Sequence, residues 1–95
     1  MRSRLIIPCD NKRIQEQMAQ VGTAIAQLTA MGFTVDRVEM DGYQRPDIRV
    51  NYDIRCRQAQ EQGKAVRNGV GNDPSGQWEL WQIQVNNCRV LWEVR

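Results

Sequence analysis

The side chains that commonly do chemistry are few in this chain, and none has a partner at a catalytic spacing. Ser3, Ser75 and three cysteines are the available nucleophiles, but the sequence contains no histidine to act as their general base. The three cysteines, Cys9, Cys56 and Cys88, do not indicate a disulfide framework, because their number is odd and their spacing is irregular. Three thiols alone bind zinc only with a fourth ligand from elsewhere. The sequence therefore predicts no catalytic site, no metal site and no cofactor.

Two other groups of residues lack the signature of a known site. Four carboxylates near one turn do not follow the spacing of a calcium loop; these are Asp36, Glu39, Asp41 and Asp47. The stretch at 69–71, Gly-Val-Gly, has no lysine after it and no strand–loop–helix context, so it is not a phosphate loop. We therefore expect a binding protein that is not an enzyme and has no small-molecule substrate.

Length and composition indicate one globular domain over residues 1–95. Hydrophobic residues make up 41% and charged residues 25%, which is ordinary for a globular protein. Eleven of the thirteen basic residues are arginine, and the net charge is only +2. The apolar run at 5–7 is too short for a signal-peptide core, and no run approaches the ~20 residues of a membrane span. A cytoplasmic protein without membrane contact is expected.

The strongest local pattern is a helix that begins after Asp10 or Asn11 and ends at Gly32. Apolar residues recur at alternating spacings of four and three, which places them along one helix face. They are Ile14, Met18, Val21, Ile25 and Leu28. Residues 4–7 are β-prone and end at a proline, which is typical of a short edge strand.

The pattern changes to a period of two after the helix. Residues 33–40 predict a strand with a bulge near Asp36 and Arg37, followed by a turn at 41–42. Residues 48–56 alternate apolar and polar side chains, which predicts a half-buried strand with one wet face and with Cys56 on its inner side. Residues 57–66 are compatible with a short helix, and residues 67–76 predict a mobile loop.

The chain ends in a predicted hairpin around Asn86 and Asn87, which tolerate the positive φ angles of a two-residue turn. Pairing across this turn sets three apolar pairs on one face, namely Val85 with Cys88, Ile83 with Val90, and Trp81 with Trp92. The elements follow the order (β)αββ–loop–ββ. We therefore predict an α+β domain of two layers, one long helix on an antiparallel sheet of four strands, or of five if residues 4–7 join it.

Three short motifs resemble those of small uncharacterised phage and prophage proteins. Residues 28–35 read Leu-Thr-Ala-Met-Gly-Phe-Thr-Val, residues 45–50 read Arg-Pro-Asp-Ile-Arg-Val, and residues 87–93 read Asn-Cys-Arg-Val-Leu-Trp-Glu. In that group the last motif more often begins with glycine than with asparagine. The resemblance implies an origin in a mobile element and a role in binding a host protein or a phage complex. It transfers no activity.

The predicted outer face of the sheet is the candidate protein interface. It carries Trp78, Leu80, Leu91 and Arg95, and interface hot spots favour tryptophan and arginine. Such a patch suits a protein partner or a homodimer. The alternative is that a bulge turns Trp78 inward, or that the loop covers it.

Single-stranded nucleic acid is the second candidate partner. On the predicted strand from Ile48 to Arg57 and on the last hairpin, four arginines project to the outer face, where phosphates could be neutralised and bases could stack. They are Arg49, Arg55, Arg57 and Arg89. Asp53 and Glu93 interrupt this positive field, and an ordinary wet sheet face explains the pattern equally.

Overall fold

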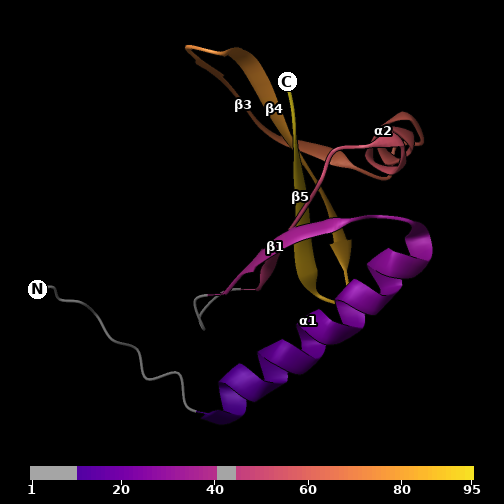
Figure 1. The fold of residues 1–95 in the computed structure, drawn as a ribbon, viewed down its shortest axis with the longest axis vertical. Coiled ribbons are helices and arrows are strands. Elements are labelled where there is room, and N and C mark those ends of the chain that lie inside the picture. Colours follow the sequence, from indigo (N-terminus) through magenta and orange to yellow (C-terminus); the bar gives the residue numbers. More distant parts are fainter. Residues whose placement is uncertain (1–10, 41–44) are drawn as a thin grey trace, which may run out of the picture.

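The computed structural model describes residues 11–40 and 45–95, which form two helices and one mixed sheet of five strands (Figure 1). The elements in chain order are α1 (Asn11–Met31), β1 (Val35–Glu39), β2 (Asp47–Val50), α2 (Ile54–Glu61), β3 (Val66–Asp73), β4 (Gly76–Val85) and β5 (Cys88–Val94). The strand predicted at 4–7, the turn predicted at 41–42 and Cys9 lie outside the described residues. An α+β fold with one long helix is confirmed.

Helix α1 follows the prediction, but its buried face is turned relative to the predicted stripe. Val21, Ala24 and Leu28 are buried, whereas Met18 is 58% exposed. The helix ends where Gly32 adopts a φ of +91° and its N–H donates to the Thr29 carbonyl at 3.1 Å, while the next N–H, of Phe33, donates to Leu28. This is the glycine-dependent stop that the sequence predicts.

The strand predicted at 48–56 is wrong in its second half. Strand β2 ends at Val50, and Asp53 begins α2 instead. The Asp53 Oδ1 atom accepts hydrogen bonds from the N–H groups of Arg55 (2.9 Å) and Cys56 (3.3 Å), which are the donors that a helix start leaves without partners. This N-cap favours a helix at these residues more strongly than the short alternating pattern favours a strand. A short helix is therefore present, as predicted, but it spans Ile54–Glu61 instead of residues 57–66.

The loop predicted at 67–76 is also wrong, because most of it forms β3. This strand pairs with β4 from Val66 opposite Gln82 to Asp73 opposite Gly76, with a bulge between Arg67 and Gly69. The turn at 73–76 reads Asp-Pro-Ser-Gly, the residue order that a type I turn favours, and the Ser75 N–H donates to the Asp73 carboxylate at 2.9 Å.

The predicted register of the last hairpin is confirmed, and so is the predicted bulge near Asp36 and Arg37. Strands β4 and β5 pair through Val85 with Cys88, Ile83 with Val90, and Trp81 with Trp92. Asn86 and Asn87 have φ angles of +49° and +62°, as a two-residue turn requires. Strands β1 and β2 pair with a register shift between Val35 and Arg37.

The strand order is β1-β2-β5-β4-β3, and one pair in it departs from the prediction. Strands β2 and β5 are parallel, with Ile48 opposite Val90, whereas the other three pairs are antiparallel. The sheet is therefore mixed. Parallel neighbours need a crossover connection, and here the segment from α2 to β4 supplies it.

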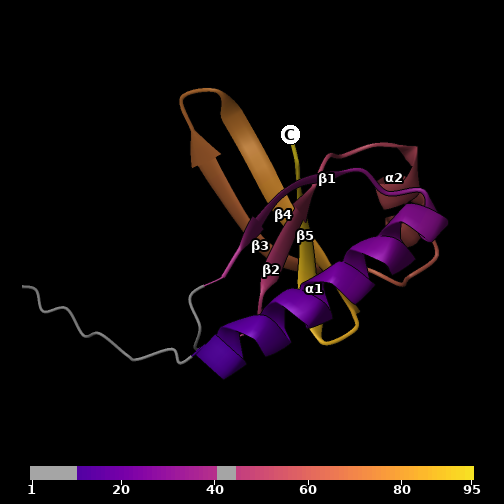
Figure 2. The same ribbon diagram turned by 60° about the horizontal axis from the view of Figure 1, so that its bottom comes forward.

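Both helices pack on the same face of the sheet, and Trp92 lies at the centre of this core. Val21, Ala24 and Leu28 of α1 and Cys56 and Ala59 of α2 join one buried cluster with Ile48, Ile83, Val90 and Trp92 of the sheet. The Trp92 Nε1 donates to Gln60 Oε1 at 2.9 Å, and its ring stacks on Phe33 at 6.1 Å between centroids. Figure 2 shows α1 running along the sheet, while the β3–β4 hairpin projects away from it.

Candidate functional site

The opposite face of the sheet, which we call the open face, carries no described helix. Since side chains alternate along a strand, Trp78 and Leu80 on β4 point to this face together with Arg89 and Leu91 on β5. Regular pairing of residues 69–73 with β4 also excludes a bulge at Trp78. The sequence therefore assigned these residues to the correct face.

Leu91 lies on the open face but is not accessible there. It is only 3% exposed, because Arg49 of β2 lies directly opposite it on one side and Gln82 of β4 on the other. Long polar side chains cover apolar neighbours with their stems. The Arg49 Nε is itself buried and has no hydrogen-bond partner among the described residues. Leu91 therefore packs within the open face and offers little surface to a partner.

Trp78 occupies a space that a glycine leaves open. Its indole lies so close to Gly71 of β3 that a Cβ atom there would meet the ring at 2.2–2.9 Å. Residues 76–78 extend past the last pair of β4 with β5, so the ring lies on the projecting tip of the hairpin. Trp78 and Leu80 remain half-buried. The two side chains thus keep accessible apolar surface on the open face.

Arg95 is held beside this tip by two carboxylates. Its guanidinium donates to Asp73 at 2.9 and 3.1 Å and to Glu93 at 2.6 Å. The hydrogen bonds from Arg95 lower the pKa of Asp73 below its ordinary value, and the same contact raises the pKa of Arg95. Arg95 and Glu93 are exposed and Asp73 is only half-buried, so the ion pairs position side chains more than they stabilise the fold.

The four arginines of the predicted nucleic-acid face do not share a face. Arg49 and Arg89 lie on the sheet, but Arg55 and Arg57 belong to α2, because the predicted strand ends at Val50. Arg89 donates twice to Asp47, at 2.8 and 2.9 Å, and this pair fixes both side chains. The continuous positive strip that the alternation suggested is therefore absent from the described residues.

The two edges of the sheet differ in a way that the sequence did not indicate. Strand β1 is five residues long, contains a bulge and bears three charges, features that block pairing with another strand. Strand β3 is eight residues long, and its central residues 68–72 read Asn-Gly-Val-Gly-Asn, without charge. Val70 in this run is 62% exposed. The Asp-Pro-Ser-Gly turn was the signal that could have revealed this edge strand.

Both described cysteines are buried free thiols. Burial raises the pKa of Cys56 from 9.0 to about 11, and burial also raises the pKa of Cys88. Cys88 lies on the inner side of its strand, as predicted, whereas Cys56 is buried from α2 and not from a strand. Within residues 11–40 and 45–95, no group of three or more metal-binding side chains is found.

The raised Cys56 pKa predicts a fall in stability at alkaline pH. Because the folded protein holds this proton more tightly than the unfolded chain, the stabilisation is complete below pH 9 and is lost as the pH rises toward 11. Denaturant unfolding through this range should show the fall, and the Cys56→Ser variant should show a shallower one. Equal slopes for both proteins would contradict the assignment to Cys56.

No helix in the described part of the chain is long and apolar enough to cross a membrane.

Neither the curated proteins nor the solved structures contain a match to the chain. A family model described as an uncharacterised protein matches residues 3–95. Because the match covers nearly the whole sequence, the chain belongs to this uncharacterised protein family.

Proposed function

We propose that this chain is a non-enzymatic binding protein that pairs with a second copy of itself along the outer edge of β3. The observation that carries the proposal is the uncharged run at 68–72 on a long edge strand. Every second residue of an edge strand directs its peptide N–H and C=O away from the sheet, and these groups form a template for another strand. Figure 1 shows the β3–β4 hairpin projecting from the body of the molecule, with β3 at the edge of the sheet.

An antiparallel pair of β3 strands with a two-fold axis at Gly71 fits this edge. Residues 69–73 pair regularly with β4, so Gly71 is the middle of the undistorted part, and the bulge stays outside it. Val70 of each copy then lies opposite Asn72 of the other, and Gly69 lies opposite Asp73. No like charges meet, and each copy offers the same surface, as a two-fold dimer requires.

Trp78 supports the same position of the axis. Its ring covers Gly71, so two copies joined there place their two indoles next to each other on the open face. Each half-buried ring then loses accessible apolar surface, and ring pairs contribute about 0.5–1.5 kcal/mol beyond that burial. The two five-stranded sheets become one continuous sheet.

A charge-exchange experiment tests the pairing by size-exclusion chromatography with light scattering. The wild-type protein is expected at twice its 11.0 kDa mass. The double variant Val70→Glu with Asn72→Glu places carboxylates opposite each other and should be monomeric, and so should Val70→Lys with Asn72→Lys. Mixing the two variants should restore a dimer, because opposite charges now face each other.

The control pair carries the same charges on α1, at the exposed residues Ala19 and Ala26, and should remain dimeric. A wild-type protein that is monomeric at every concentration contradicts self-pairing. Dimers that persist in both edge variants contradict the use of β3. A shift onto short single-stranded DNA at low salt but not at high salt would instead favour the arginine-based alternative.

From the resemblance at 28–35, 45–50 and 87–93 we also propose that the gene belongs to a phage or prophage. This proposal concerns origin alone. Genes for virion or lysis proteins beside relatives of this chain would support it, and neighbours drawn only from stable chromosomal operons would contradict it.

A further inference from the structure

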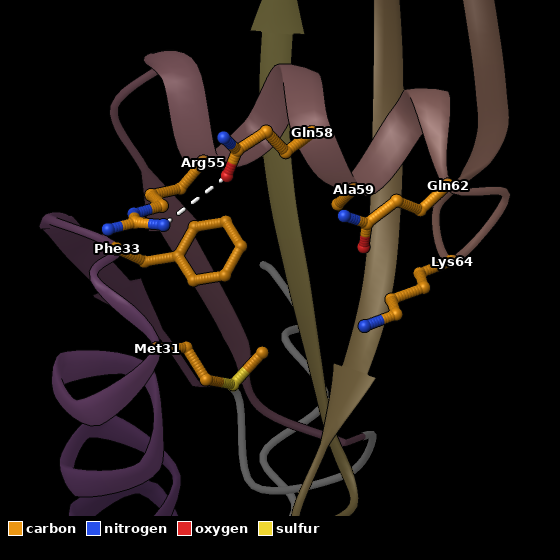
Figure 3. A pocket seen from close by; sticks show the side chains of 7 residues that line it. All are labelled: Met31, Phe33, Arg55, Gln58, Ala59, Gln62 and Lys64. Atoms are coloured by element: carbon orange, nitrogen blue, oxygen red, sulfur yellow. Dashed lines mark hydrogen bonds between the residues drawn. The ribbon is translucent and has the colours of Figure 1, made fainter.

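A pocket of about 280 Å³ lies between the carboxyl end of α1 and one side of α2 (Figure 3). Met31 and Phe33 contribute from the end of α1, and Ala59 contributes from α2. Figure 3 shows the Arg55 guanidinium beside the Phe33 ring at one side of the pocket and the Lys64 side chain reaching in from the other. We call this site the cationic pocket. It lies on the helix side of the sheet and is separate from the tip of the β3–β4 hairpin.

The charge of the lining is positive and is not balanced locally. Arg55 and Lys64 line the pocket, and no carboxylate does. The Arg55 guanidinium donates to the neutral Gln58 amide at 3.3 Å. By contrast, five other described arginines form ion pairs with carboxylates; they are Arg37, Arg57, Arg67, Arg89 and Arg95.

The acidic groups of the neighbouring helix are engaged elsewhere. The Asp53 carboxylate caps the first turn of α2, and Glu61 pairs with Arg57 at 3.2 Å. The carboxyl end of α1 also carries partial negative charge, at most roughly half an elementary charge, while the short α2 presents both of its ends to the pocket lining, so that its opposite partial charges largely cancel. Two full positive charges exceed this, so the pocket keeps a net positive charge.

The floor of the pocket is apolar and fixed. Phe33 is buried, and its ring stacks on Trp92 with an angle of 28° between the ring planes. The Arg55 side chain lies across Gly32, where a Cβ atom would come within 2.7 Å of its Nε. The apolar side chains of Met31, Phe33 and Ala59 thus lie beside polar ones from Arg55, Gln58, Gln62 and Lys64, so the lining can contact both an apolar and an anionic part of one small molecule.

We propose that the cationic pocket binds a small molecule in which a carboxylate or phosphate is joined to a flat apolar ring. The oxyanion lies between Arg55 and Lys64, since guanidinium and ammonium groups both donate hydrogen bonds to such oxygens. The ring rests on Phe33 and Met31. The pocket volume admits one ring with one anionic group, and does not suit a larger ligand.

Methionine methyl NMR reports on this site directly. Met31 lines the cationic pocket, whereas Met18 and Met40 line a separate apolar groove between α1 and β1. Benzoate and phenyl phosphate should shift the Met31 methyl signal in a saturable way and leave Met18 and Met40 unchanged. Inorganic phosphate should bind more weakly, and neutral benzyl alcohol should cause no saturable shift. Comparing benzoate with phenyl phosphate tells which oxyanion is preferred.

Matched variants test the two cations. Lys64→Gln and Arg55→Gln should each weaken benzoate or phenyl phosphate binding about tenfold, the loss expected for one charged hydrogen bond. Lys12→Gln and Arg57→Gln remove the same charges outside the pocket and should leave binding unchanged. Lys64 is exposed, so its variant is expected to fold even if Arg55→Gln loosens the end of α1.

Three results overturn the proposal. The first is a Met31 signal that responds to none of the anions, which would mean that Arg55 and Lys64 interact only with groups of the protein itself. The second is an equal response to benzyl alcohol. The third is an equal loss of binding in Lys12→Gln, which would indicate attraction by net charge alone.

Discussion

Replacing Trp92 by alanine is expected to lower the free energy of unfolding by about 3–5 kcal/mol, the range for a large buried aromatic residue. Trp92 is fully buried, and it contacts elements from three parts of the chain. It stacks on Phe33 after α1, donates to Gln60 on α2 and lies opposite Trp81 on β4. Urea unfolding followed by circular dichroism measures the change without relying on tryptophan fluorescence.

The Trp92→Phe variant separates the ring from its hydrogen bond. It keeps an aromatic group against Phe33 but leaves the Gln60 side-chain oxygen without the indole donor. The loss should therefore be smaller than for alanine, and a lost buried hydrogen bond costs about 1–3 kcal/mol. If Trp92→Ala destabilises no more than the half-buried Trp78→Ala does, Trp92 is not the centre of the core.

Replacing Leu28 by alanine should cost about 2–5 kcal/mol, whereas Met18→Ala should change stability by less than about 0.5 kcal/mol. Both residues belong to the stripe that the sequence predicts, but Leu28 is 0% exposed and Met18 is 58% exposed. The same unfolding measurement on both variants determines which face of α1 packs on the sheet. Equal losses would support the predicted stripe and contradict the observed rotation of the helix.

Features set by neighbouring residues could be predicted from the sequence. The helix period, the glycine stop at Gly32 and the Asn86–Asn87 turn each depend on a few adjacent side chains. Because the turn determines the register of β4 and β5, the prediction also assigned Trp78 and Leu80 to the correct face of the sheet. These local rules hold for α1 and for the last hairpin.

Features that depend on competition or on distant partners could not be predicted. At 51–56 the capping carboxylate of Asp53 competes with an alternating pattern, and the cap prevails. At 66–73 the strand has few apolar side chains, so apart from the Asp-Pro-Ser-Gly turn β3 is evident only from its pairing with β4. The burial of Leu91 depends on Arg49, which the parallel pairing of β2 with β5 brings beside it. No local pattern encodes that pairing.

The position of β5 in the sheet has a consequence for synthesis of the protein. It is the last of the five strands to be made, yet it lies in the middle of the sheet, between β2 and β4. While a ribosome is still producing the chain, the β1–β2 pair and the β3–β4 hairpin have no strand to join them. Contacts between residues far apart in sequence also form slowly. The sheet should therefore be completed only after β5 emerges, and until then nascent chains expose apolar surface that chaperones recognise.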